Sequence, residues 1–302
     1  MFYCPSLEIG NSRNFGEVRD QVHRIVCSIR PSHDMGSIDH TFALAEVAAQ
    51  GLLLGYSGLL TPYHDQGHML EVVLCSARLL HGAHLAGRRV DALTIDACLI
   101  GALLHDSGYL MSQSELSGTG AQFTRVHVLR GVVFAETFLS GILPPDLMRA
   151  TDKVILATDH RPTAILPDFE NPAQQLAAQI TATADLIAQM ANREYLERLF
   201  LLFFEFKEAG IKVFSDIHDL LEKTGGFYAY MHRRLQGELG DLSPLLVRHF
   251  DQARGDPRNY YTDSVARNLD YLSQLLKEEG ERRLDYLRRG HIVDQAIDLL
   301  EK

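Results

Sequence analysis

Histidine and aspartate side chains recur inside or at the ends of apolar segments, where a polar group most needs a partner. The chain has 302 residues and contains 14 histidines, against 29 lysines and arginines together. His64 and His68 are four residues apart, a spacing that puts both side chains on one face of a helix. Because imidazoles serve as metal ligands and proton donors, this composition indicates metal or proton chemistry.

An adjacent pair, His105 and Asp106, closes the strongly apolar segment 97–104. A carboxylate buried at the end of such a helix needs compensation, and a metal ion provides it by binding the imidazole and the carboxylate together. Alternatively, Asp106 only forms the turn before Gly108 at the end of the helix. The motif by itself leaves both interpretations open.

Three further polar residues lie in or next to apolar segments. Asp185 interrupts the segment 176–190, where a buried carboxylate needs a metal ion or an arginine as its partner. His160 follows Asp159 at the end of another apolar segment, and either member of that pair could be the functional one. His127, taken alone, is explained by a hydrogen-bonded core histidine. The hypothesis of a metal site therefore depends on the whole set.

The set occurs in the order H…HD…H…H…D. This order resembles that of the HD superfamily of metal-dependent phosphohydrolases, and most closely the catalytic domain of cyclic nucleotide phosphodiesterases. Residues 63–72 (YHDQGHMLEV) are similar to that family's YHNxxHxxDV segment. Residues 102–106 (ALLHD), 155–159 (ILATD) and 184–185 (AD) resemble its ALxHD, LATD and AD elements. The resemblance covers roughly residues 40–215 and implies an HD/PDEase-like multi-helix fold.

Carried over to the matching positions, the resemblance implies that four residues hold one metal ion: His68, His105, Asp106 and Asp185. His64 would be the general acid that protonates the leaving oxygen, and Asp106 would also touch or orient the attacking water. Imidazole and carboxylate ligands suit Fe, Mn, Mg or Zn. Two such divalent ions would clamp the phosphoryl oxygens and activate the water for in-line attack on phosphorus.

Two positions depart from the phosphodiesterase pattern. Asp65 stands where the family has Asn, and Tyr109 stands where its HDxxH segment has the second histidine. In other HD proteins with two metal ions, histidines on the following helices hold the second ion, and two histidines occupy those places here. The predicted dinuclear site has six ligands: His68, His105, Asp106, His127, His160 and Asp185.

Arg130 and Arg161 are the predicted contacts to a substrate phosphate. Arg130 lies one turn after His127 on a predicted helix, and Arg161 directly follows His160. The expected substrate is a small-molecule phosphate ester, namely a nucleotide phosphodiester, with a 3′,5′-cyclic nucleotide as the leading candidate.

Two alternatives to a phosphohydrolase stay open. In some HD proteins the same ligand set holds two irons that activate O₂, which would make the chain an oxygenase. A non-catalytic HD-like protein could instead act in signalling, although a binding module has no reason to bury unpaired His and Asp. Bound metal and hydrolysis of a phosphodiester would separate these alternatives.

Helices must bring these residues together, and helical periodicity dominates the chain. Start and stop signals predict helices over 40–56, 61–81, 91–106, 123–139, 145–159 and 172–191. A loop is predicted at 111–122, and interruptions of the later helices at Gly225-Gly226, 237–240 and 255–257. No segment alternates apolar and polar residues over five or more positions between turn residues, so an all-α fold is expected.

Composition and charge exclude several classes of protein. Apolar residues make up 46% and charged residues 23%, as in soluble globular proteins. The formal net charge of −10 argues against a nucleic-acid partner. The densest apolar run, 199–206, is far too short to span a membrane. The four cysteines have no CxxC spacing, and a cytoplasmic location is expected.

A single domain is expected over residues 1–302. Its metal-binding core would cover about 40–215, and additional C-terminal helices would cover about 216–302. Alternatively, the C-terminal helices form a separate oligomerisation unit, in which case a homodimer could result.

Overall fold

Twelve α-helices make up most of the chain in this computed structural model, which describes residues 13–115, 117–161, 163–278 and 280–300. The all-α expectation is confirmed for these residues, because none of them lies in a β-strand. The helices are α1 (Phe15–Ile29), α2 (Gly36–Ala49), α3 (Gln66–Leu85), α4 (Ala92–Leu104), α5 (His127–Leu139), α6 (Pro145–Ala157), α7 (Pro172–Ala191), α8 (Tyr195–Glu208), α9 (Ile217–Gln236), α10 (Leu245–Arg254), α11 (Tyr260–Leu275) and α12 (Ile292–Leu300).

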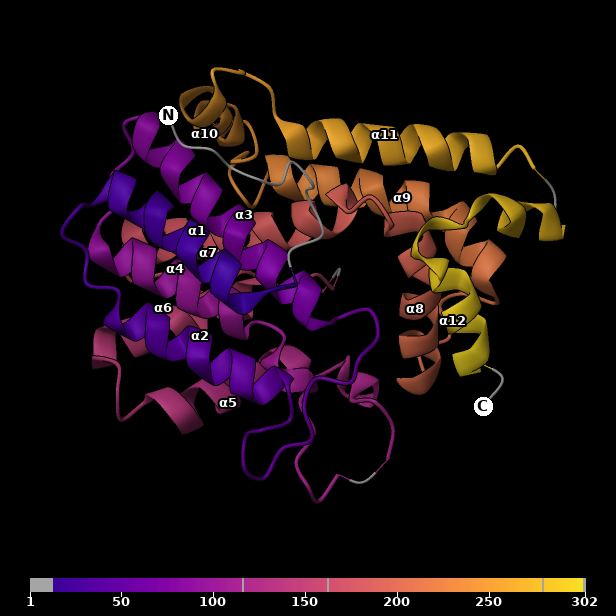
Figure 1. Cartoon of the computed structure of the whole chain (residues 1–302), viewed down its shortest axis with the longest axis horizontal. Coiled ribbons are helices and arrows are strands. Elements are labelled where there is room, and N and C mark those ends of the chain that lie inside the picture. The colour runs from indigo at the N-terminus through magenta and orange to yellow at the C-terminus, as the bar shows by residue number, and fades with distance from the viewer. Residues whose placement is uncertain (1–12, 116, 162, 279, 301–302) are drawn as a thin grey trace.

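The helices α3, α4 and α7 pack against one another at the centre of the larger helix group in Figure 1. Every residue of α3 from His68 to Ala83 is buried. The helix α4 is apolar on all sides, so it must be covered on all sides, and α2, α3, α6 and α7 surround it. A polar side chain on any of these three helices therefore projects into a core that offers it few partners.

Side-chain caps start two of the central helices where the sequence predicts. Asp91 accepts a hydrogen bond from the backbone N–H of Thr94 at the start of α4. Asn171 accepts one from the N–H of Gln174 at the start of α7, which ends at Ala191 as expected. These caps satisfy N–H groups that have no partner within the helix.

The start of α3 differs from the prediction. The helix is expected from residue 61, but Asp65 caps it by accepting a 2.9 Å hydrogen bond from the N–H of His68, so the helix begins at Gln66. The hydroxyl of Thr61 instead donates to the carbonyl oxygen of His64, which closes a turn before the helix. His64 therefore lies outside α3, and the prediction that it shares a helix face with His68 is wrong.

Three other predicted boundaries are also wrong. The helix α2 ends at Ala49 rather than at 56, and Gly51, with a φ of 71°, then redirects the chain. The helix α5 begins at His127, since residues 121–123 form a separate 3₁₀ turn. Gly225-Gly226 does not interrupt a helix but lies inside α9.

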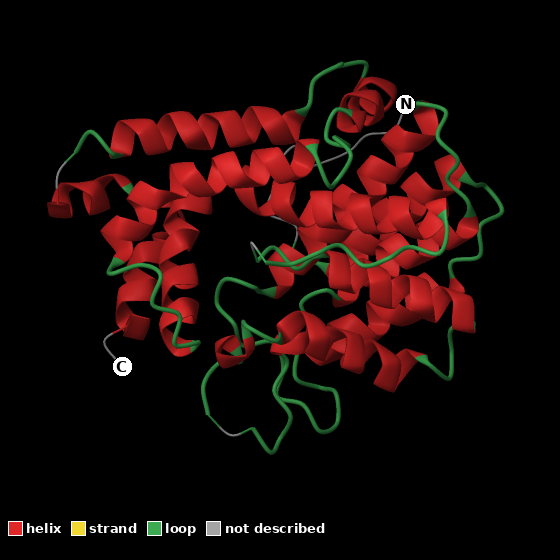
Figure 2. Ribbon diagram, turned by 180° about the vertical axis from the view of Figure 1, so that it is seen from behind, coloured by secondary structure: helices red, strands yellow, loops and turns green. Residues whose placement is uncertain are grey.

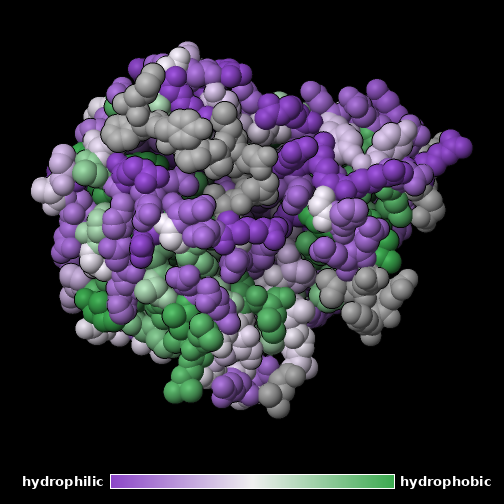
Figure 3. Space-filling view, in the orientation of Figure 1, coloured by the Kyte–Doolittle hydropathy of each residue, from purple (hydrophilic) through white to green (hydrophobic). Residues whose placement is uncertain are grey.

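The helices α8, α9, α11 and α12 extend the molecule to one side, whereas α10 lies over the larger helix group (Figures 1 and 2). Of the helices after residue 216, α10 packs on α3 and α11 packs on α7, whereas α12 packs on α8. The face shown in Figure 3 is mostly hydrophilic, with an apolar area near its lower edge. Within the described residues, no helix combines the length and the apolar character needed to cross a membrane.

A buried pair of histidines joins α10 to α3. The Nδ1 atoms of His81 and His249 are 2.9 Å apart, and each residue is 7% exposed. The two helices can approach because residue 82 is glycine: a Cβ on Gly82 would lie 2.1 Å from the carbonyl oxygen of Leu245. Burial, followed by repulsion from the Arg78 guanidinium, lowers the pKa of His249 to about 2, and burial also lowers the pKa of His81. The pair is therefore neutral in the folded protein.

We expect this pair to make the fold sensitive to acid. Below about pH 6.5 the unfolded chain takes up a proton that buried His249 does not accept, so the free energy of unfolding falls by up to about 1.4 kcal/mol per pH unit. His249→Asn should flatten the plot of this free energy against pH between about 6.5 and 4. Urea unfolding at each pH measures the slope. His232→Asn, at an exposed position of α9, is the control; equal slopes in His249→Asn and wild type would contradict the prediction.

Candidate metal centre

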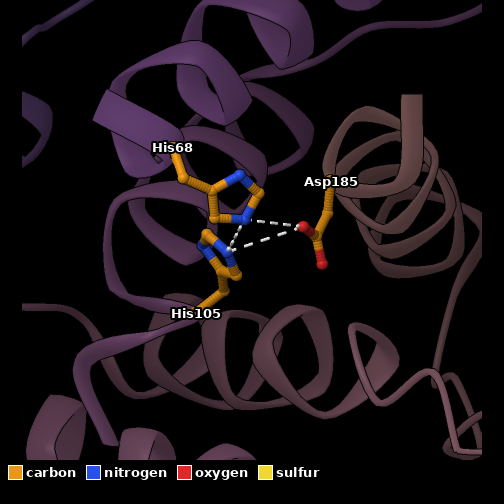
Figure 4. A group of neighbouring side chains, drawn as sticks. All are labelled: His68, His105 and Asp185. Atoms are coloured by element: carbon orange, nitrogen blue, oxygen red, sulfur yellow. Dashed lines mark hydrogen bonds and ion pairs between the residues drawn. The ribbon is translucent and has the colours of Figure 1, made fainter. Parts of the chain in front are cut away.

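Ligand atoms from three separate elements meet in the core. His68 comes from α3, His105 directly follows α4, and Asp185 comes from α7; one ligand atom of each lies within 4.8 Å of the other two. Nε2 of His68 is 3.0 Å from Oδ1 of Asp185 and 3.3 Å from Nε2 of His105. Figure 4 shows the three side chains pointing toward one another. Two imidazoles and a carboxylate in this arrangement form a candidate site for a transition metal.

Asp106 adds a second carboxylate to this group. Its Oδ2 atom is 3.2 Å from Nε2 of His105 and 3.6 Å from Nε2 of His68. The same oxygen is buried and accepts no hydrogen bond from the described residues. A buried carboxylate oxygen without a donor is costly, whereas a cation among these residues would satisfy it. The donor set and the orphaned oxygen of Asp106 both fit a divalent metal ion.

Two more histidines approach the carboxylates from the solvent side. Nε2 of His127 lies 3.7 Å from Oδ1 of Asp106, and Nε2 of His160 lies 2.7 Å from Oδ2 of Asp185. Each carboxylate thus presents one oxygen to the inner imidazoles and the other to an outer imidazole. The outer side chains are 20% exposed, against 2% for His105. The structure brings all six predicted ligands together, as an inner and an outer group.

Backbone carbonyls orient two of the imidazoles. Nδ1 of His105 is 2.9 Å from the carbonyl oxygen of Ala102, and Nδ1 of His127 is 2.8 Å from that of Thr124. A carbonyl oxygen only accepts hydrogen bonds, so Nδ1 carries the proton in both rings. Burial lowers the pKa of His127, so its Nε2 keeps a lone pair, which is the state that a metal ligand requires. Burial also lowers the pKa of His105, but the carboxylates of Asp106 and Asp185 raise it to about 9. Its Nε2 is therefore protonated at neutral pH, and a bound metal ion would replace that proton.

The two carboxylates are ionised. Burial raises the pKa of Asp106, but the imidazoles of His105, His64 and His68 hold it well below its usual range. The same two effects act on the pKa of Asp185. Burial raises it, but the neighbouring histidines, His160 first among them, hold it well below its usual value. The centre therefore holds two ionised carboxylates inside an apolar core, where protonated imidazoles or a bound cation must compensate their charge.

His64 lies beside this cluster and is held by Glu205 of α8. Nδ1 of His64 is 2.5 Å from Oε2 of Glu205, and Oε1 accepts hydrogen bonds from the backbone N–H groups of Tyr63 and His64. Burial lowers the pKa of His64, but the carboxylate of Glu205, with further contributions from Asp106 and Asp185, raises it to about 9. The imidazole therefore carries a proton at neutral pH.

Tyr109 fills the place of the histidine that the phosphodiesterase pattern would have. Its buried ring stacks on two neighbouring imidazoles, with centroids 4.7 Å from His64 and 4.5 Å from His127. The centroids of the two imidazoles are themselves 6.3 Å apart. The start of α5 can come this close because residue 108 is glycine: a Cβ on Gly108 would lie 1.8 Å from the carbonyl oxygen of His127. Tyr109 thus packs against both rings and restricts their orientation.

Sequence reasoning missed Glu205 and the role of Asp65. Glu205 lies in the apolar run 199–206, which reads as core; a carboxylate within an apolar helix is the same signal that singles out Asp185. Asp65 has a structural role, because its Oδ1 caps α3 and its Oδ2 is 3.2 Å from Nη1 of Arg198. The departure from the family's Asn therefore leaves the helix start intact.

The two predicted phosphate ligands have other partners. Nη1 of Arg130 donates to Glu115 (2.8 Å), Nε donates to the carbonyl oxygen of Gly108, and the guanidinium lies 3.6 Å from the ring centroid of Phe123. Arg161 donates to the carboxylate of Asp159, two residues before it. Both guanidinium groups are paired within the chain, and that Arg130 and Arg161 bind a substrate phosphate stays a prediction.

We expect Asp106→Asn to weaken metal binding at least tenfold. The amide keeps the shape of the side chain but loses the charge, and even residues that only orient a ligand typically contribute about 10- to 100-fold to affinity. Metal content after dialysis against Mn²⁺, measured by mass spectrometry, tests this. Asp152→Asn, which changes a partly buried carboxyl of α6 outside the cluster, is the control. If Asp106→Asn retained as much metal as wild type, Asp106 would not be a ligand.

Six residues from five neighbouring segments of the chain therefore form the candidate centre, and His64 with Glu205 stands next to it. No family model, no curated protein and no solved structure matches the chain. The function must accordingly be inferred from the residues of the site themselves.

Proposed function

We propose that the chain is a metal-dependent phosphohydrolase that cleaves a phosphodiester, with a 3′,5′-cyclic nucleotide as the leading substrate. The observation that carries this proposal is a protonated His64, held by Glu205, beside four imidazoles and two carboxylates. Hydrolysis of a phosphodiester requires positive charge at the phosphoryl oxygens and a proton for the leaving oxygen. The cluster and His64 would supply these two requirements from adjacent positions.

We also propose that the fold is HD/PDEase-like. The order of the ligands along the helices supports this assignment. They come from the start of α3, the end of α4, the start of α5, the segment after α6 and the middle of α7, in the order His68, His105-Asp106, His127, His160 and Asp185.

Two divalent ions would be held by His68, His105, His127, His160, Asp106 and Asp185. When bound, divalent ions stabilise negative charge on the phosphoryl oxygens and lower the pKa of a water. Fe, Mn, Mg and Zn are all candidates, because imidazole and carboxylate donors suit each of them. Asp106 and Asp185 would serve both sets of imidazoles. Each has one carboxylate oxygen near the inner pair, His68 and His105, and the other near an outer histidine.

The chain's own residues control the proton. Glu205 accepts the hydrogen bond from Nδ1 of His64, which leaves Nε2 as the nitrogen that donates to the leaving oxygen. Tyr109 stacks on the ring and restricts its rotation. The His64 side chain is 18% exposed, so a substrate that approaches from solvent can reach it.

A hydrolysis panel tests the proposed reaction. It comprises cyclic mononucleotides, cyclic dinucleotides, nucleoside monophosphates and an aryl phosphodiester, each with Mn²⁺, Mg²⁺, Zn²⁺ or Fe²⁺. Metal-dependent hydrolysis of a phosphodiester is the expected result. Bound iron with a mixed-valent magnetic signal and O₂ consumption, without hydrolysis, would make the chain an oxygenase. Neither bound metal nor hydrolysis would point to a non-catalytic protein.

We expect His64→Asn to lower kcat by about 10²- to 10⁴-fold, because the leaving oxygen then receives no proton from the protein. Metal content should stay at the wild-type level, since His64 is not among the six ligands. Steady-state kinetics and metal analysis of one preparation measure both quantities. His84→Asn, at an exposed position of α3, is the matched control. A variant that kept the wild-type kcat would remove His64 from the mechanism.

Glu205→Gln should change the pH dependence of the reaction. A general acid works only when protonated, so activity falls as pH rises through the pKa of His64, which the Glu205 carboxylate raises. Glutamine keeps an acceptor for Nδ1 but removes the charge, and the alkaline limb of kcat/KM should therefore move to lower pH. A limb at the same pH in both proteins would show that it reports another group.

A further inference from the structure

A cavity of about 490 Å³ lies between α7, α9 and α11, a volume typical of small-molecule sites. α9 and α11 run alongside each other in Figure 1, and α7 forms the floor through Ile187 and Met190. These residues follow Asp185 by two and five positions, which at about 100° per residue places them on the opposite side of α7. The cavity is therefore separate from the metal centre, although the two share a helix.

The lining of the cavity is polar at one end and apolar along the rest. On α9 it extends from Gly225 to Gln236, a distance of about 16 Å at 1.5 Å per residue. The polar end is formed by Asp241, Ser243 and Thr262, where the cap of α11 is hydrogen-bonded to the carbonyl oxygen of Ser243. Beyond it the walls are mainly aliphatic, and His232 of α9 is the one imidazole among the described residues that form them. The aliphatic lining residues are Ile187, Met190, Leu235, Val265 and Leu269. This polarity suits an elongated amphiphile.

The ring of Tyr228 adds an aromatic surface to the lining. Tyr228 is 7% exposed, and its buried hydroxyl makes no hydrogen bond to any described residue. Its ring lies 5.7 Å from that of Tyr195 in α8, centroid to centroid. The hydroxyl is therefore covered by the core and is not offered to a ligand in the cavity.

Gly225 explains why the cavity stays open. Glycine inside a helix costs about 1 kcal/mol relative to alanine, yet nothing lies within 4 Å of where a Cβ on Gly225 or Gly226 would be. Close packing therefore does not require either glycine. Gly225 lines the cavity, and a larger side chain there would occupy it, whereas Gly226 is exposed outside it.

The charge of the lining selects the head group of the ligand. Asp241 is its only carboxylate, His232 adds one imidazole, and neither lysine nor arginine occurs among the described residues that line the cavity. Asp241 is exposed and held at a φ of 51°, with its N–H donating to the carbonyl oxygen of Leu235. We propose that the cavity binds an elongated amphiphile with an amine head at Asp241 and an apolar body along the aliphatic walls.

Fluorescence titration with two dansyl probes tests this assignment on the full chain. Dansylcadaverine carries an amine head, an alkyl spacer and an aromatic sulfonamide with acceptor oxygens; dansyl-6-aminohexanoic acid replaces the amine by a carboxylate. The amine probe should bind with 1:1 stoichiometry and at least about tenfold more tightly than the acid, since a like charge at Asp241 repels the latter. Asp241→Asn should reduce this preference to about twofold or less.

Two glycine variants localise the binding. Gly225→Leu should weaken the amine probe at least about tenfold by filling the cavity, whereas Gly226→Leu should leave its affinity within about twofold. Both substitutions introduce the same residue one position apart in α9, so their effects on helix propensity match. Tyr228→Phe, which removes only the buried hydroxyl and keeps the ring, should leave the affinity within about twofold. Circular dichroism confirms that each variant is folded.

Three outcomes would overturn the proposal. They are no saturable binding of either probe, equal affinity of Gly225→Leu and wild type, and equal affinity of the two probes for wild type. A change of oligomeric state in Gly225→Leu but not in Gly226→Leu would instead assign the cavity to a second copy of the chain, and it too would overturn the proposal. Binding here requires no activity at the metal centre, so its outcome is independent of the hydrolysis panel.

Discussion

Two carboxylates buried in an apolar core, Asp106 and Asp185, set the constraint on which the rest of the structure depends. Each would destabilise the fold strongly if left alone, so positive or hydrogen-bonding groups must surround it. The central helices bring His68 and His105 to the inner side, and α5 and the segment after α6 bring the outer histidines. The inner oxygen of Asp106 still lacks a donor, and this remaining deficit is what a metal ion would relieve.

Glu205 of α8 is a third buried carboxylate, and hydrogen bonds from the chain itself satisfy it. Its buried carboxylate is satisfied by two backbone N–H groups and by the imidazole of His64, whose pKa it raises. The turn that carries His64 is held further by Arg198, which donates to the carbonyl oxygen of Tyr63. The proton site therefore depends on α8, whereas the proposed metal ligands come from α3 to α7, and the two meet only in the folded chain.

The helix α7 contributes residues both to the candidate metal centre and to the cavity. One side presents Asp185 to the histidines, and the opposite side forms the floor of the cavity under α9 and α11. Since α11 packs directly on α7, the helices beyond residue 216 are attached to the element that carries a predicted metal ligand. The additional C-terminal helices thus have two roles. α9 and α11 form the cavity with α7, and α10 covers α3.

The sequence alone determined what depends on neighbours along the chain. The caps at Asp91 and Asn171 and the apolar character of α4 are local, and they predicted the central helices. The polar residues within apolar segments indicated a site, and the resemblance carried by their order along the chain gave the six candidate ligands. Only the tertiary structure decided which polar groups meet. Glu205 reaches His64 across 141 positions, and Arg130 pairs with Glu115. Such pairings depend on how helices pack, and periodicity reports only which face of a helix is buried, not what it will be buried against.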